Sequence, residues 1–133
     1  MLTRFENDSH IHTRALQIYL VLVSLAWNRQ TITYGAISRE QMDRYGDGGI
    51  INRPLGCIMG WCYENGLEPL TVLVVNEETG VPGGGLITVP NGDWPGAQQR
   101  VYSFNWFSVM PPSLDELREA GQRAEAGTLR EPD

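Results

Sequence analysis

Apolar positions in the first part of the chain follow a helical spacing that short segments interrupt. The residues after Ser9 carry apolar side chains on two sides of a helix, the second side ending at Trp27, which predicts a central helix over 10–29. Residues 31–34 are β-branched and aromatic and predict a short strand. A second helix is expected over 36–45, where a glycine-rich turn stops it.

A third helix is predicted over residues 53–65. Asn52 is expected to cap its start, Pro54 suits its first turn, and Gly66 suits the left-handed position after its end. Two helices joined by a glycine-rich turn are typical of a helix-turn-helix. The apolar run 70–75 then predicts a strand that is buried on both faces.

The remaining elements are a wing and two further helices. After a turn, residues 81–89 are expected to return as a second strand or wing. Apolar spacing over 97–107 favours a helix, although its aromatic residues also suit a strand. The capping-box pattern at 113–116 predicts a final helix over 114–126, followed by a flexible tail over 128–133.

Together these elements predict one α+β domain over residues 1–127. It is a winged helix-turn-helix with a long N-terminal helix, a small sheet and extra C-terminal helices from about residue 94. The length of 133 residues and an apolar fraction of 41% suit a single globular core. The longest apolar run, 18–27, is about half of what crosses a bilayer, and no secretory pattern accompanies it. We therefore expect a cytoplasmic protein with no membrane partner.

The charged residues exclude several classes of function. All ten basic residues are arginine, which rules out a Walker A loop, a Schiff-base lysine and a Ser-Lys dyad. The net charge of −6 opposes strong non-specific binding to nucleic acid. Residues 1–66 hold six arginines and six acidic residues, whereas residues 67–133 hold four arginines and ten acidic residues. Any anion-binding face is therefore expected in the first half.

Candidate catalytic and metal-binding residues are sparse. His10 and His12 stand two residues apart, where helical side chains diverge, and no other histidine is present, so no metal is expected. Cys57 and Cys62 lie five apart on one predicted helix and point to different faces, so they cannot pair. This cysteine pattern favours a reducing compartment. No acid-base or nucleophile pair is visible, so we expect neither an enzyme nor a cofactor.

Three short motifs, in this order, resemble a known family. They are Thr-Tyr-Gly-Ala-Ile-Ser at 33–38, Asn-Arg-Pro-Leu-Gly at 52–56, and Leu-Glu-Pro-Leu-Thr-Val-Leu-Val at 67–74. They resemble the DNA-binding domain of the O6-alkylguanine-DNA alkyltransferases and the non-catalytic alkyltransferase-like proteins. That family has Thr-Tyr-Gly-x-Ile/Val-Ala, then Arg-Ala-Val-Gly opening the recognition helix, then a Pro-Ile-Leu-Ile strand. The resemblance covers about residues 28–85.

The resemblance implies roles for three residues in binding double-stranded DNA. Tyr34 would rotate a phosphate and help to extrude a nucleotide, and Arg53 would replace the flipped base in the stack. Gly56, like Gly60 four residues later, would let the recognition helix approach DNA or a partner helix. Where the alkyltransferases have Pro-Cys-His-Arg, this chain has Val-Asn-Glu-Glu at 75–78, so alkyl transfer is not expected.

Two hypotheses about function follow. The first is a non-enzymatic, alkyltransferase-like DNA binder in which Arg29, Arg39, Arg44 and Arg53 supply phosphate and base contacts, which requires a positive patch. The alternative is a winged-helix protein-interaction module, a small acidic bacterial or phage regulator or inhibitor, whose acidic half meets a basic partner or whose aromatic segment forms a homodimer. It predicts arginines that are scattered or paired with acids, and an exposed apolar patch.

The aromatic residues of the second half leave two interpretations open. They would either form a surface for stacking bases or binding a protein, or supply a second layer of the core. The residues concerned are Trp94, Tyr102, Phe104, Trp106 and Phe107.

Overall fold

The computed structural model describes residues 1–2, 11–38, 51–83 and 89–133. This part of the chain is mostly helical and belongs to the broad α+β class. Its helices and strands are α1 (Ile11–Trp27), β1 (Ile32–Thr33), α2 (Tyr34–Ile37), α3 (Asn52–Glu64), β2 (Val74–Val75), α4 (Trp94–Ser103) and α5 (Leu114–Ala126). Short 3-10 turns are η5 (Leu70–Leu73), η6 (Pro90–Gly92) and η7 (Trp106–Ser108).

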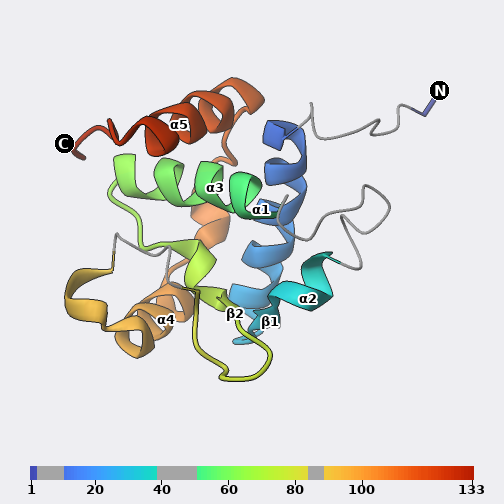
Figure 1. Ribbon diagram of the computed structural model, residues 1–133, viewed down its shortest axis with the longest axis vertical. Coiled ribbons are helices and arrows are strands. Elements are labelled where there is room, and N and C mark those ends of the chain that lie inside the picture. Colours follow the sequence, from blue (N-terminus) through green and yellow to red (C-terminus); the bar gives the residue numbers. More distant parts are fainter. Residues whose placement is uncertain (3–10, 39–50, 84–88) are drawn as a thin grey trace.

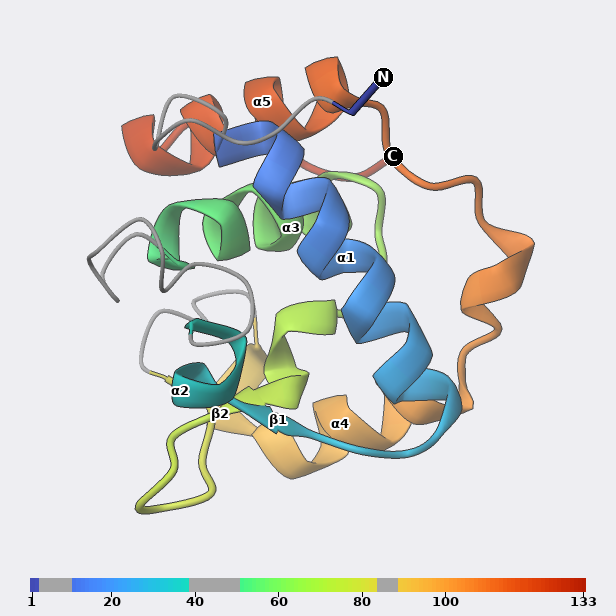
Figure 2. The same ribbon diagram turned by 90° about the vertical axis from the view of Figure 1, so that its right-hand side faces the viewer.

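Helix α1 runs along the molecule from α5 at one end to α4 at the other (Figures 1 and 2). Helix α3 packs against both α1 and α5, while the sheet, α2 and α4 lie at the opposite end from α5. Ile18 and Leu22 of α1, Ile58 of α3 and Leu117 of α5 are fully buried in one hydrophobic cluster. The predicted central helix is confirmed, because α1 contributes to the core along most of its length.

Helices α3 and α5 approach each other closely at two glycines. A Cβ atom on Gly60 would lie 2.9 Å from the backbone oxygen of Ala120 and 3.1 Å from Leu129. A Cβ atom on Gly121 would collide with the sulfur of Cys57. The neighbour that Gly60 admits is therefore a partner helix of the same chain, α5.

The two strands form a small parallel sheet in which Ile32 pairs with Val74 and Thr33 with Val75. The strand predicted over 70–75 is correct in burial, since all six residues are buried, but only its last two residues are a strand. Residues 70–73 form a 3-10 turn instead. A fully buried apolar run has no alternating pattern, so its spacing does not separate a strand from a tight helical turn.

The boundaries of two helices differ from the prediction because of their capping groups. Asn52 is the first residue of α3 rather than its cap, and Ile51 at the cap position makes no side-chain hydrogen bond. Helix α4 begins at Trp94, three residues before the predicted start, because the Asp93 carboxylate caps it by accepting a hydrogen bond from the Gly96 N–H. The helix predicted over 97–107 is therefore shifted toward the N-terminus.

Other boundaries follow the prediction more closely. The capping box is confirmed, with the Ser113 and Glu116 side chains each accepting a hydrogen bond from the other's backbone N–H. The strand predicted over 31–34 is shorter, because Tyr34 already begins α2. The tail predicted to be flexible contacts the helices at several points, among them the Thr128 N–H, which donates to the Arg123 carbonyl at 2.8 Å, and the Arg130 N–H, which donates to Glu64 at 2.8 Å.

Parts of the predicted helix-turn-helix and wing lie outside the described residues. These are most of the second helix, its glycine-rich turn and residues 84–88. Of the predicted wing strand, Pro82 is described and forms an isolated antiparallel bridge with Val75. Among the described residues, no helix is long and apolar enough to cross a membrane.

Candidate functional site

Of the residues predicted to contact DNA, Tyr34 lies on α2 and Arg53 and Gly56 lie on α3, and Tyr34 and Arg53 each have a partner within the chain. Tyr34 is half-buried at the start of α2, and its hydroxyl accepts a hydrogen bond from the Gly83 N–H at 3.1 Å. Arg53 lies in the first turn of α3, and its guanidinium pairs with Glu125 of α5 at 2.9 Å.

The remaining predicted DNA contacts are open or undescribed. A Cβ atom on Gly56 would have no atom of the described residues within 4 Å, so that face of α3 is free of close described neighbours. Arg39 and Arg44 lie outside the described residues. Three further arginines pair with carboxylates: Arg100 with Glu68 at 2.7 Å, Arg118 with Asp115 at 2.9 Å, and Arg123 with Glu64 at 2.7 Å.

A cavity of about 540 Å³ opens where the C-terminal ends of α1 and α4 meet η7. We call it the aromatic cavity. It is lined by Val23, Trp27, Arg29, Tyr102, Ser103, Phe104, Asn105, Trp106 and Phe107. Five of these nine residues are aromatic, and none carries a carboxylate.

Two edge-to-face ring pairs build the aromatic cavity. Trp27 and Phe107 lie 5.2 Å apart between ring centroids, and Phe104 and Trp106 lie 4.8 Å apart. Trp27 is 70% exposed and Phe107 66% exposed, whereas Trp106 is buried and its indole N–H donates to the Val101 carbonyl at 2.9 Å. The cavity therefore has a fixed, hydrogen-bonded tryptophan beneath and two solvent-exposed rings at its edge.

Local backbone geometry places these side chains. Helix α4 ends because Phe104 adopts an extended conformation. The Asn105 side chain then accepts a hydrogen bond from the Phe107 N–H at 3.2 Å, which starts the tight turn η7. Consecutive residues of one short connection therefore present their rings on the same side as the end of α1.

Arg29 is the charged residue of the aromatic cavity. It follows α1 in a left-handed conformation with φ 54°, which is uncommon for a residue with a side chain. Its guanidinium carbon lies 5.8 Å from the centre of the Tyr102 ring, within the range of a cation–π contact. Burial raises the pKa of Tyr102, and the charge of Arg29 opposes that shift. The guanidinium is thus held beside the rings.

Sequence reasoning identified the aromatic residues of the second half but missed the contribution of α1. Trp27 was expected on an apolar stripe of the central helix, yet most of its surface is exposed. A signal was available, because Trp27 stands in the last turn of the helix, next to the polar Asn28, where core contacts end. Of the two interpretations of the aromatic segment, Trp106 joins the core while Phe104 and Phe107 form the surface.

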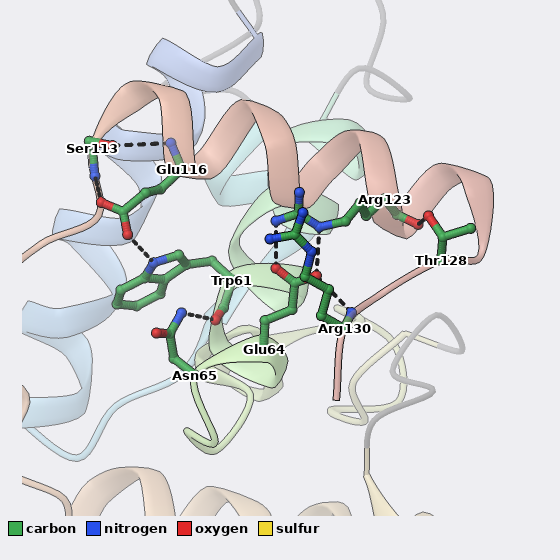
Figure 3. A network of polar contacts seen from close by, with 8 residues as sticks. All are labelled: Trp61, Glu64, Asn65, Ser113, Glu116, Arg123, Thr128 and Arg130. Carbon is green, nitrogen blue, oxygen red and sulfur yellow. Dashed lines mark hydrogen bonds and ion pairs between the residues drawn. The ribbon is translucent and has the colours of Figure 1, made fainter. Parts of the chain in front are cut away.

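A second group of polar residues ties α3, α5 and the tail together (Figure 3). Glu64 accepts two hydrogen bonds at 2.7 Å from Arg123 and one from the Arg130 N–H. These contacts, with Arg123 contributing most, hold the pKa of Glu64 below its ordinary value. Trp61 donates to Glu116 at 3.2 Å, and the pKa of Glu116 is lowered chiefly by its backbone hydrogen bond at Ser113. Every partner in this network is supplied by the chain itself, which indicates a structural role.

The cysteines are not poised for nucleophilic chemistry. Burial raises the pKa of the Cys57 thiol to about 11 and that of Cys62 to about 12, so both stay protonated at neutral pH. Both are free and buried. Across the described ranges, no three His, Cys, Asp or Glu side chains gather as metal ligands.

Comparison of the chain with family models, with curated proteins and with solved structures found no match.

Proposed function

We propose that this protein is a non-enzymatic interaction module that binds a segment of a partner protein in the aromatic cavity. The observation that carries the proposal is the preformed cavity itself, with two largely exposed rings beside a guanidinium. The order of α1, β1, α2, α3 and β2 follows that of a winged helix, which we retain as the proposed architecture.

The composition of the aromatic cavity supports this function. Tryptophan, tyrosine and arginine are the residues that most often dominate the energy of protein interfaces. Large exposed rings such as Trp27 and Phe107 are unfavourable in water, and clustered ones mark contact surfaces. The volume of about 540 Å³ is also within the range of cavities that enclose several side chains or a small ligand.

The arrangement of the arginines favours a protein partner over DNA. A DNA-binding face needs cations that are free to neutralise phosphates. Arg53, the residue assigned to the base stack, is instead paired with Glu125, and three further arginines are also in ion pairs. DNA binding through Tyr34, Arg53 and Gly56 stays a prediction that a duplex-binding assay can test.

The proposal is tested by selecting proteins that bind this chain and then measuring the binding of each purified candidate. Immobilised wild-type protein and the variants Trp27→Ala and Leu20→Ala are used to select interacting proteins, and each candidate is then purified and titrated by calorimetry. Leu20 is the matched control, since it is an exposed apolar residue of the same helix outside the aromatic cavity. We expect the partner to bind the wild type and Leu20→Ala equally and Trp27→Ala at least about tenfold more weakly. Equal binding by all three would refute the assignment of this surface.

A parallel assay covers the DNA hypothesis. A labelled duplex, with and without an O6-alkylguanine, is titrated with the wild type and with Arg53→Ala at low and at physiological salt. We expect no binding that depends on Arg53. Tight binding that prefers the lesion and is lost in Arg53→Ala would replace the proposed function with damage recognition.

A further inference from the structure

Arg29 differs from the paired arginines in having no carboxylate partner among the described residues. Arg53, Arg100, Arg118 and Arg123 each form an ion pair, whereas Arg29 contacts the Tyr102 ring. The side chain is exposed at the edge of the aromatic cavity. A guanidinium in this position has its hydrogen-bond donors available to a ligand.

The position of Arg29 is fixed by the end of α1. Its N–H donates to the Ala26 carbonyl at 3.2 Å, and the next residue, Gln30, donates to the Leu25 carbonyl at 2.9 Å. These two bonds close the helix around the left-handed residue, so the guanidinium leaves the backbone at a defined point. The cation–π contact with Tyr102 further limits its movement.

The charge at the aromatic cavity is opposite to that of the whole protein. The chain carries a net charge of −6, yet the nine lining residues include one arginine and no acidic residue. A cationic anchor would meet Arg29 at the same rings, and like charges in contact oppose binding. In a ligand that carries an anion next to an apolar group, the anion would pair with Arg29 and the apolar group would pack against the rings.

We propose, on the basis of the function proposed above, that the partner segment presents an aromatic side chain with a carboxylate on a neighbouring residue. The aromatic ring packs against the exposed faces of Trp27 and Phe107, and the carboxylate pairs with Arg29. Guanidinium and carboxylate match as planar, two-point hydrogen-bonding groups, which sets the orientation of the segment. The rings supply most of the affinity, while Arg29 favours a partner segment whose neighbouring residue is negatively charged.

The test uses three matched sets of capped peptides with identical flanks. Their central pair is an aromatic residue followed by Glu, Gln or Lys. Each set is titrated against the wild type, Arg29→Gln and Arg118→Gln. Arg118 is the control, an exposed arginine paired with Asp115 on α5 and not part of the aromatic cavity.

We expect the wild type to bind the Glu set about three- to fivefold more tightly than the Gln set, with the Lys set weakest. This preference should disappear in Arg29→Gln, persist in Arg118→Gln and shrink as salt is added. In ¹⁵N spectra, the indole signals of Trp27 and Trp106 should shift on binding while that of Trp61, in the α3–α5 network, stays in place.

Two results would overturn the inference while leaving the proposed function intact. One is equal binding of the Glu and Gln sets, lost in Trp27→Ala. The other is a Glu preference that survives in Arg29→Gln. If no set binds and the selected partner also binds Trp27→Ala as tightly as the wild type, the inference and the proposed function both fail. Self-association of the chain that Trp27→Ala abolishes, with no peptide bound, would assign the cavity to a second copy and also overturn the inference.

Discussion

Two glycines of α3, four residues apart, should respond to alanine in opposite ways. Within a helix, alanine is about 1 kcal/mol more favourable than glycine, so both substitutions gain this amount before packing is considered. At Gly56 a new Cβ atom meets no described atom within 4 Å. Gly56→Ala should therefore stabilise the protein by about 0.5–1 kcal/mol.

At Gly60 the same methyl group meets atoms that cannot easily move. It would lie 2.9 Å from the Ala120 backbone oxygen, so α5 must shift by some tenths of an ångström. Overpacking of this kind costs about 1–3 kcal/mol. Since the helix-propensity gain is the same at both positions, Gly60→Ala should be less stable than Gly56→Ala by about that amount.

Urea unfolding of both variants and the wild type, followed by tryptophan fluorescence, measures this difference. In a parallel thermal unfolding experiment, a gap of about 1 kcal/mol corresponds to a shift in Tm of about 3–5 °C for a domain of this size. If Gly60→Ala were as stable as Gly56→Ala, the close approach of α3 and α5 would be wrong. Gly56→Ala also bears on function, because a bulkier residue there would weaken DNA binding if this face of α3 met DNA.

Three further predictions follow from the structure. The pKa values of Glu64 and Glu116 are held below the ordinary 4.5, so the stability that these carboxylates contribute is complete above pH 4.5 and is lost as the pH falls through their folded-state values. Acidification should therefore reduce the stability of Glu64→Gln less than that of the wild type, as measured by acid unfolding. An equal loss of stability in both proteins would contradict the lowered pKa of Glu64. Trp27→Ala should change the unfolding midpoint little, since the side chain is 70% exposed, and a large drop in calorimetry would show that Trp27 belongs to the core. Cys57, with a pKa of about 11, should react with a thiol reagent at neutral pH only as fast as the protein opens; rapid labelling of the folded protein would refute its burial.

Local signals in the sequence were sufficient to predict the main helices. The spacing of apolar residues predicted α1 and α3, because each helix turns apolar side chains into the core, and the capping-box pattern predicted α5. The capping box at Ser113 and the left-handed Gly66 were also predicted correctly. These features depend on contacts between residues that are only a few positions apart, so the local sequence alone specifies them.

For the uniformly buried segment 70–75, the sequence predicted that the residues lie in the core but not which backbone conformation they adopt. Residues 70–75 are buried as expected, yet four of them form a tight turn. The carbonyl of Val72 is satisfied by the Gln98 side chain of α4 at 3.0 Å, a partner 26 residues away. Whether such a backbone group bonds to a strand or to a distant side chain is decided by packing.

The candidate site was decided by tertiary structure in the same way. The sequence showed a group of aromatic residues in an acidic second half and no lysine anywhere, and it excluded several catalytic classes. It could not show that Arg53 meets Glu125, that Arg29 has no such partner, or that Trp27 lies beside Phe107. The Arg53–Glu125 and Trp27–Phe107 contacts join residues 72 and 80 positions apart, and the state of Arg29 depends on the absence of a described carboxylate beside it. Local periodicity holds no information about either, because only the packing of α1 against α4 and of α3 against α5 brings the groups together.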